Sequence, residues 1–519
     1  MTTAIIGYTG FVGKNLLVLE NFDEFYNSSN LQDIRGKKFY KLYISCIPAE
    51  KWKANKFPEE DKANIDAICE VLSTVEAFTT IVISTIDVYA DTSSNRNEFS
   101  NMDDENHAYG RNRFEFERFA LRHFKNGCYI LRLPALFGMG LKKNALYDLL
   151  NRKYDQVEKV SPRSKFQWYN LDWFNSPWCG NSFLNIIEHC ISENIHVLNL
   201  VTEPIEMSEI FKLFDYTSTN TSEPIIYDTK SFHSETGYFR RKEYVLRSIK
   251  EFIQTYSMSR NNLRVSNICV NNMSQFQFGR ILELYGIKQV QIAPTKLTSW
   301  EKLDELDLNT IYPGLQVTSL QSITYGIEGT IFNSPDVLLN HLSRVVNFAS
   351  KFNIRTFVFG CPKNRMKNEN DSIDTAIAFF RSLGEMCAPF DITVCVEPNS
   401  IEYTNFLNDI SSVGDFVRLV DHPNIRMMVD IGHLNSEQVS CYSQYTDIIC
   451  NIDISRPGMR YLDSSSPIVH ESLDNLREIL SENNYSKTIN LEMILGTCES
   501  LELRESLKTF ISKFSESFR

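Results

Sequence analysis

Eight short apolar segments in the second half of the chain constrain its fold more than any other feature. They lie between residue 264 and residue 519 and alternate with amphipathic segments such as residues 338–352 and 376–387. The eight segments read RVSNICV, KQVQIAPT, LQVTSLQSI, RTFVFGCP, ITVCVEPN, IRMMVDIGH, DIICNIDIS and TINLEMI. Eight such repeats in a stretch of this length predict a (β/α)8 barrel of parallel strands.

Acidic residues accompany the last four of these segments. Glu397, Asp430, Asp453 and Glu492 each come at the end of an apolar run. The C-terminal ends of parallel strands meet at one rim of a barrel, so we expect these carboxylates to lie close together. Oxygen ligands suit a divalent metal, and paired carboxylates can transfer protons.

Length and charge limit the classes of protein that this chain can represent. A chain of 519 residues is too long for one ordinary core, and we predict a first domain at 1–257, a linker at 258–263 and the barrel at 264–519. The net charge is -12 without a basic block, which argues against nucleic acid or an anionic membrane as the main partner. No signal peptide and no apolar run of about 20 residues are seen, which predicts a cytoplasmic protein.

The 12 cysteines are scattered and form no C-x-x-C pair. Several, including Cys46, Cys269, Cys395 and Cys450, lie inside apolar runs. We therefore expect buried, reduced thiols and no disulfide framework.

The first half opens with an apolar strand at residues 3–6 and a G-x-x-G-x-x-G turn before a helix. Glycines in this position let the backbone approach a pyrophosphate, and further apolar runs at βαβ spacing predict a doubly wound parallel (Rossmann) sheet. The candidate cofactor-binding residues are Gly7, Thr9, Gly10, Phe11, Val12 and Gly13.

The pieces GYTGFVG, STIDVY, HAYGRNR and LRLPALFG make the first half resemble the extended short-chain dehydrogenases, which include NAD-dependent sugar epimerases and reductases. The resemblance implies NAD or NADP as cofactor, and a substrate carbonyl or hydroxyl polarised by Ser84 or Thr85 together with Tyr109. The position that holds a lysine in the family is Arg113 here. Arginine is cationic but is not equivalent to lysine at a tuned site, so a domain kept only for binding or assembly stays an alternative.

The pieces VFGCPKNR, CVEPN, VDIGH and INLEM make the second half resemble the xylose-isomerase-like sugar-phosphate isomerases and epimerases. The resemblance implies one divalent metal. It also implies that Glu397 and Glu492 are metal ligands and the acid/base pair, that Asp430 is a ligand, and that His433 contacts substrate.

This chain departs from that family on the seventh strand. Asp453 stands where the family has a metal-binding histidine, and an all-carboxylate site favours Mn or Mg over Zn. The basic residues near the predicted rim are candidates for holding a phosphate or carboxylate of the substrate: Lys363, Arg365, Arg456 and Arg460.

Together the two halves predict a bifunctional cytoplasmic enzyme that acts on a small sugar or sugar phosphate. The barrel would be a metal-dependent isomerase or epimerase working through an enediolate, fused to an NAD(P)-dependent oxidoreductase or epimerase domain. Two alternatives stay open: a dehydratase or lyase barrel, and a non-catalytic binding or scaffolding role for one of the domains. The resemblance of the first half is compatible with a homodimer.

Overall fold

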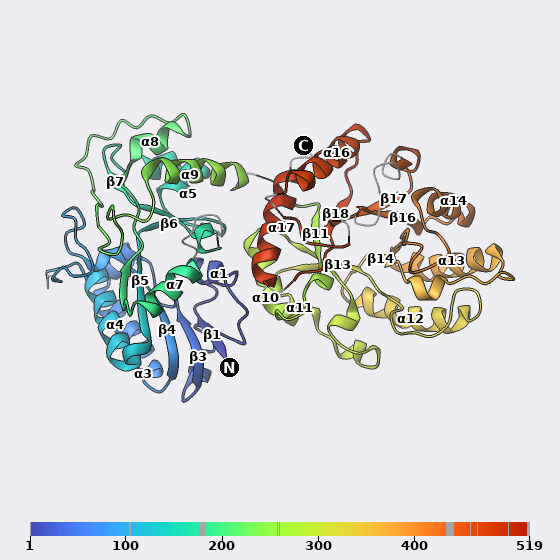
Figure 1. Cartoon of the computed structure of the whole chain (residues 1–519), viewed down its shortest axis with the longest axis horizontal. Coiled ribbons are helices and arrows are strands. Elements are labelled where there is room, and N and C mark those ends of the chain that lie inside the picture. Colours follow the sequence, from blue (N-terminus) through green and yellow to red (C-terminus); the bar gives the residue numbers. More distant parts are fainter. Residues whose placement is uncertain are drawn as a thin grey trace. The chain divides into compact units, whose positions relative to one another are not determined.

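The chain forms two compact units, Met1–Ser257 and Met258–Arg519. The computed structural model describes residues 2–102, 105–175, 183–256, 258, 260–431, 441–456, 458–463, 466–496 and 498–515 (Figure 1). Among these residues, none of the helices combines the length and the apolar character needed to cross a membrane.

The first unit is built on a six-stranded sheet in which every neighbouring pair of strands is parallel. The strands, in their order across the sheet, are β2 (Glu24–Tyr26), β1 (Thr3–Ile6), β3 (Lys38–Ile44), β4 (Glu76–Thr85), β5 (Cys128–Leu133) and β9 (Val197–Asn199). All residues of β1 and β5 are buried, as expected for central parallel strands covered on both faces. The sheet is Rossmann-like, and its two edge strands are β2 and β9.

Helices cover both faces of this sheet, with α3 and α4 along one side and α1 and α7 along the other (Figure 1). The helices of the unit are α1 (Phe11–Leu16), α2 (Lys51–Lys56), α3 (Pro58–Leu72), α4 (Ala108–Phe124), α5 (Ala145–Leu150), α6 (Tyr154–Val157), α7 (Phe183–Ser192), α8 (Met207–Lys212) and α9 (Lys242–Tyr256). Two small sheets, β6 (Ala135–Phe137) with β8 (Trp168–Asn170) and β7 (Lys165–Phe166) with β10 (Ile205–Glu206), complete it. Trp168 on β8 and Trp173 in the turn of 3-10 helix that follows are both buried.

The second unit confirms the predicted barrel. Eight parallel strands close on themselves, each within one of the eight apolar segments apart from the first residue of β11. They are β11 (Leu263–Ser266), β12 (Gln289–Ile292), β13 (Gln316–Leu320), β14 (Thr356–Phe359), β15 (Thr393–Val396), β16 (Ile425–Asp430), β17 (Ile449–Ile454) and β18 (Thr488–Leu491).

A ring of helices surrounds the barrel (Figure 1). Its described members are α10 (Gln275–Leu284), α11 (Leu308–Ile311), α12 (Pro335–Lys351), α13 (Ile373–Cys387), α14 (Ile410–Val420), α16 (Pro467–Glu482) and α17 (Glu499–Phe514). Each long helix turns an apolar stripe to the strands; in α12 the buried residues include Leu338, Leu342, Val345 and Val346, at helical spacing.

The barrel interior corrects one expectation about the cysteines. Cys395 on β15 and Cys450 on β17 are joined as a disulfide, although both were predicted to be reduced thiols. The register between β16 and β17 shifts by one residue at Cys450, and this bulge brings its side chain into a cluster with Cys395, Val358 and Met428. The cysteines with free thiols are Cys46, Cys69, Cys128, Cys190, Cys269, Cys361, Cys387 and Cys498.

Candidate functional site

Three carboxylates come together at the C-terminal rim of the barrel. Glu397 follows β15, Asp430 ends β16 and Glu492 follows β18. One oxygen of each lies within 4.8 Å of the others, which is the spacing of a group able to hold one metal ion. Asp430 and Glu492 are buried and Glu397 is half-buried.

Asp453, the fourth predicted ligand, lies beside this trio but is not part of it. It is paired with Asp430 across the β16–β17 ladder and is fully buried. Its Oδ1 accepts a 2.5 Å hydrogen bond from the Asn451 amide, and it also hydrogen-bonds Glu492. Asp453 therefore contacts the three carboxylates through its hydrogen bond to Glu492.

A buried arginine supports Asp453 from inside the barrel. The guanidinium of Arg264 on β11 donates to the side-chain oxygens of Asn451 and Asn490, and it lies close enough to Asp453 to stabilise its negative charge. Asn490 in turn donates to Gln291 on β12. This network of buried polar side chains connects four neighbouring strands of the barrel, β17, β18, β11 and β12.

The electrostatics of the site disfavour four negative charges without a cation. Removal from water, followed by the carboxylates of Asp430 and Asp453, raises the pKa of Glu397 well above its usual range. Burial and then Asp453 do the same to the pKa of Glu492. Burial also raises the pKa of Asp453, against the opposing hydrogen bond to Glu492 and the charge of Arg264.

Two buried guanidinium groups offset part of this charge. Arg264 and Arg365 are both buried, and burial lowers the pKa of each to about 10. The four carboxylates outnumber these two cations, so a divalent cation would neutralise the remaining charge. An oxygen-only donor set with this excess of negative charge fits Mg or Mn.

The segment GCPKNR holds Glu397 in place. A Cβ at Gly360 would collide with the Glu397 carboxylate, so a larger residue there would displace that carboxylate. Asn364 binds the Thr324 hydroxyl and the carbonyls of Ile327 and Gly329, which fixes the loop. Arg365 donates to the backbone carbonyl of Glu397 at 2.8 Å.

The other predicted substrate-binding residues are more exposed than Arg365. Lys363 and Arg460 are exposed and Arg456 is half-buried. Arg456 and Arg460 pair through their backbone in the loop after β17. His433 lies outside the described residues.

In the first unit, the glycine turn follows β1 as predicted. Gly7 has a positive φ of 88°, and a Cβ on Gly13 would collide with the Gly7 carbonyl, so both glycines are needed for the close turn. A Cβ on Gly10 would meet only the Gly7 carbonyl, at 3.3 Å. Thr9 completes the turn, and Phe11, Val12 and Gly13 begin α1, which is six residues long.

The residues beyond the turn do not fit a nicotinamide dinucleotide. The end of β2 offers Asn27 rather than an acid for the ribose hydroxyls, and its amide already binds the Tyr8 hydroxyl. The guanidinium of Arg113 is bonded to both carboxylate oxygens of Asp61 and to the carbonyl of Pro48. Neither group is free for a ribose.

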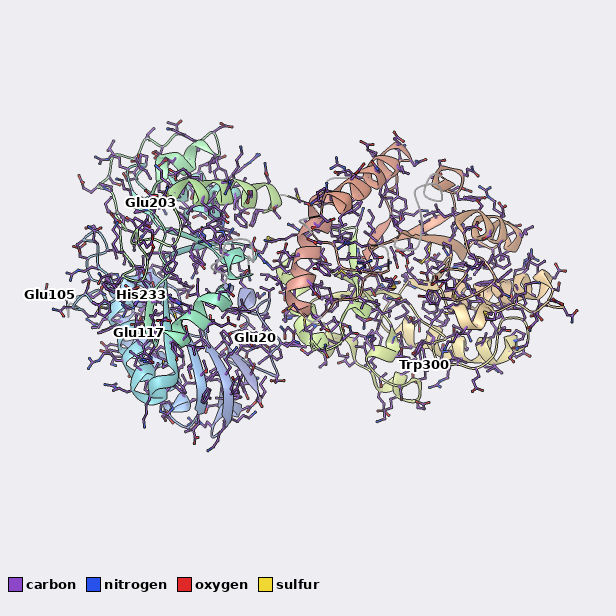
Figure 2. The ribbon with its side chains drawn as sticks, viewed as in Figure 1. Glu20, Glu105, Glu117, Glu203, His233 and Trp300 are labelled. Carbon is purple, nitrogen blue, oxygen red and sulfur yellow. A yellow bond between two sulfur atoms is a disulfide. The ribbon has the colours of Figure 1, made fainter. Side chains whose placement is uncertain are left out.

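Ser84, at the end of β4, belongs to a different network. Its hydroxyl donates to Glu117 at 2.5 Å, and the same carboxylate receives the guanidinium of Arg132. Glu117 is labelled in Figure 2. Glu117 and Arg132 are buried and Ser84 is half-buried, so the Ser84 hydroxyl is engaged in the fold.

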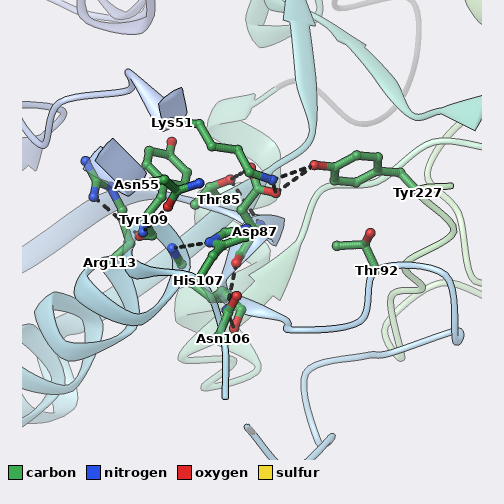
Figure 3. A network of polar contacts seen from close by, with 12 residues as sticks. Lys51, Asn55, Thr85, Asp87, Thr92, Asn106, His107, Tyr109, Arg113 and Tyr227 are labelled. Carbon is green, nitrogen blue, oxygen red and sulfur yellow. Dashed lines mark hydrogen bonds and ion pairs between the residues drawn. The ribbon is translucent and has the colours of Figure 1, made fainter. Parts of the chain in front are cut away.

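Thr85 and Tyr109 do come together at the end of β4, beside Arg113 (Figure 3). Burial raises the pKa of Tyr109 to about 12, with a further contribution from the charge of Asp87. Arg113 stacks on the Tyr109 ring at 4.0 Å from its centroid, but its charge is shared with Asp61.

Some residues of these sites were not predicted. Arg264 lies between Leu263 and Val265 in a fully buried strand, and a cation between apolar residues is a signal for a buried network. Asp87, three residues after Ser84, follows a strand end as the barrel acids do. Lys51 and Tyr227, which contact Asp87, carry no local signal.

Residues 283–512 match the family model described as xylose isomerase-like TIM barrel. The second unit thus contains a xylose isomerase-like TIM barrel domain. No curated protein matches the sequence.

Solved structures are similar to about half of this chain at low identity. A 3-keto-D-glucoside 4-epimerase from E. coli is 16% identical, with a TM-score of 0.39, covering 49% of this chain and 99% of its own. A D-psicose 3-epimerase from Clostridium cellulolyticum H10, solved with D-tagatose, is 13% identical, with a TM-score of 0.37, covering 49% and 96%. An IolI protein with a bound zinc atom is 13% identical, with a TM-score of 0.39, covering 50% and 99%.

Proposed function

We propose that the barrel is a metal-dependent isomerase or epimerase of a small sugar or sugar derivative. The observation that carries the proposal is the group of three carboxylates at the rim, with oxygens within 4.8 Å of one another. Glu397, Asp430 and Glu492 would hold one Mn or Mg ion. When bound, such an ion polarises a carbonyl and neutralises developing negative charge.

Glu397 and Glu492 are the proposed acid/base pair. They come from β15 and β18, two strands that are not neighbours in the barrel, so they approach a substrate from different sides. One carboxylate removes a proton from the carbon next to a carbonyl, and the other returns a proton to the enediolate that results. Burial and the neighbouring carboxylates raise the pKa of both groups.

Asp453 has a supporting role in this proposal. Its hydrogen bonds to Asn451 and Glu492 orient the Glu492 carboxylate, while Arg264 balances its charge. Lys363, Arg365, Arg456, Arg460 and His433 stay predictions for substrate contacts, which a phosphate or carboxylate on the substrate would use.

For the first unit the oxidoreductase function stays a prediction of the sequence, and the contacts of Asn27 and Arg113 argue against it. Fluorescence titration with NADH and NADPH tests it. Saturable binding of either would support it, and no binding of both would contradict it.

Metal content and deuterium exchange test the barrel proposal. The full chain is loaded with Mn, desalted and measured by mass spectrometry, alongside Glu397→Gln and the matched control Glu402→Gln, which changes an exposed residue five positions later. We expect about one Mn per chain in wild type and in the control, and none in Glu397→Gln.

The loaded protein is then incubated in D2O with a panel of aldoses, ketoses and their phosphates. Carbon-bound deuterium in the sugar, absent with Glu492→Gln, would support proton transfer next to a carbonyl. A product that has lost water would identify the dehydratase alternative. Failure of wild type to retain metal would refute the proposal.

A further inference from the structure

The disulfide between Cys395 and Cys450 lies directly below the carboxylates of the barrel. Side chains two positions apart on a strand point to the same side, so Cys395 faces the barrel interior with Glu397, which follows it by two residues. Met428 has the same relation to Asp430, and it belongs to one cluster with both cysteines. The bond therefore lies one layer of side chains beneath the proposed metal site.

The bond joins two strands that are not neighbours in the barrel. β16 lies between β15 and β17. A covalent link across β16 restrains three strands that each carry a carboxylate at or just after their C-terminal part, namely Glu397, Asp430 and Asp453. The two cysteines are 55 residues apart in sequence, so no local segment of the chain supplies the same restraint.

The bulge at Cys450 decides which side of β17 faces the interior. Cys450 is the extra residue of β17, because its neighbours Ile449 and Asn451 pair with two consecutive residues of β16. After the bulge, Asp453 pairs with Asp430, and paired residues of parallel strands point to the same side. Without the bulge the pairing would be displaced by one residue, and Asp453 would point out of the barrel.

The orientation of Asp453 matters for a ligand of the proposed metal. Asp453 accepts a hydrogen bond from Asn451 at 2.5 Å and hydrogen-bonds Glu492. If β17 loses its bulge, Asp453 leaves this position and Glu492 loses a group that orients it. The state of Cys450 is thus coupled to the Glu492 carboxylate.

The bond can be reached from the Cys450 side. Cys395 is fully buried, whereas Cys450 is half-buried. Lys487 Nζ donates to the backbone carbonyl just before Cys450 at 2.5 Å, Arg426 lies near this lysine, and Asp447 offsets part of their charge. Positive charge stabilises a thiolate, which is the form of cysteine that exchanges with disulfides and reacts with peroxide.

The pairing pattern of the cysteines favours a reversible bond over a structural framework. Eight further cysteines have free thiols. Disulfide frameworks stabilise small domains that lack a sufficient core, whereas this barrel has a large apolar core of its own. One bonded pair among many free thiols is typical of a redox-sensing pair.

We propose that Cys395 and Cys450 form a reversible redox switch of the barrel. The disulfide anchors the bulge of β17 and so assembles the carboxylates. Its reduction lets the bulge relax and weakens the site for a metal ion. The effect on the metal rests on the function proposed above, whereas the effect on β17 does not.

A dithiol reduces the bond in two exchange steps. Its thiolate attacks the Cys450 sulfur, and Cys395 leaves and takes up a proton. The second thiol of the reductant then closes on the first and releases Cys450, so the reductant leaves as a disulfide.

Hydrogen peroxide drives the reverse direction. The Cys450 thiolate attacks one peroxide oxygen and becomes a sulfenic acid, and the hydroxide that leaves takes up a proton to form water. The Cys395 thiol then displaces a second water and closes the disulfide.

Hydrogen exchange and Mn binding in the full chain test the switch. One sample is oxidised with stoichiometric hydrogen peroxide, another is reduced with dithiothreitol, and both are desalted without air. Thiol alkylation and peptide mapping record whether Cys395 and Cys450 are bonded. Cys450→Ser imitates the reduced state, and Cys498→Ser, which removes an exposed free thiol of the same unit, is the matched control.

We expect amide exchange in peptides that cover β17 to be about tenfold faster in the reduced chain, because the bulge opens locally. The dissociation constant of Mn, measured by electron paramagnetic resonance, should rise about tenfold, as for other groups that orient a ligand. Peroxide should reverse both changes. Cys450→Ser should show the reduced values under both conditions, and Cys498→Ser should respond as wild type does.

The proposal is overturned if oxidation leaves Cys395 and Cys450 unbonded, or if β17 exchanges equally in the two states. It is also overturned if Cys450→Ser still responds to reduction, because another cysteine then carries the effect. Faster exchange with unchanged Mn affinity would overturn the effect on the metal. If neither state binds Mn, the proposed function fails, and the exchange of β17 still decides whether the switch exists.

Discussion

Replacing Arg264 with methionine tests how the barrel tolerates its buried acids. Arg264 is 1% exposed and donates to Asn451 and Asn490, close to the fully buried Asp453. Methionine has similar length but no charge. The variant therefore leaves the Asp453 charge without its cation, and it leaves two buried amide oxygens without a donor.

We expect the barrel to lose about 3–5 kcal/mol of its free energy of unfolding, the usual cost of removing one partner from a buried charged pair. For a domain of this size, that loss lowers the melting temperature by roughly 10 °C. Differential scanning calorimetry of the metal-free full chain measures it. Arg355→Met is the control, because Arg355 is exposed, and it should change stability by no more than about 0.5 kcal/mol.

A double variant separates the charge from the packing. Adding Asp453→Asn to Arg264→Met removes the unbalanced carboxylate, so we expect about half of the lost stability to return. The reasoning would be refuted if Arg264→Met melts within about 2 °C of wild type, or if the effects of the two substitutions simply add.

Three further predictions concern the metal and its ligands. The folded, metal-free barrel holds protons on Glu397 and Glu492 more tightly than the unfolded chain, whose glutamates titrate near 4.5. Its free energy of unfolding should therefore fall as pH rises from about 5 to 8, and bound Mn should reverse this fall. Urea unfolding with and without Mn measures both effects. Asp430→Asn should weaken Mn binding by at least about 100-fold and Asp453→Asn by only about tenfold, measured by electron paramagnetic resonance; equal effects would make Asp453 a direct ligand. Gly360→Ala should displace the Glu397 carboxylate and weaken Mn binding as well, and unchanged affinity would show that the loop can move aside.

Much of the barrel could be predicted because its physical causes are local. A parallel strand buried on both faces must be apolar along its length, so each of the eight strands is visible as a short apolar run. An acid at the end of such a run lies at the rim whatever the rest of the chain does. This is why Glu397, Asp430 and Glu492 were predicted to come together and do so.

Side-chain partners could not be predicted in the same way, because they depend on where distant segments meet. Asp453 has the same local sequence setting as the other acids, yet Arg264, from a strand at the other end of the barrel sequence, draws it into a buried network. Arg113 stands at a position that the sequence assigns to catalysis, but Asp61, 52 residues earlier, takes its charge.

Local features and long-range contacts differ in the same way elsewhere in the chain. The sequence by itself determined the eight strands, the glycine turn and the acids at the rim, because periodicity and strand ends are written in neighbouring residues. Only the tertiary structure decided the disulfide of Cys395 with Cys450, which depends on a one-residue bulge, and the contact of Lys51 with Tyr227. The physical reason is that hydrogen bonds and ion pairs act over a few ångströms in space, and the chain's path sets which residues come that close.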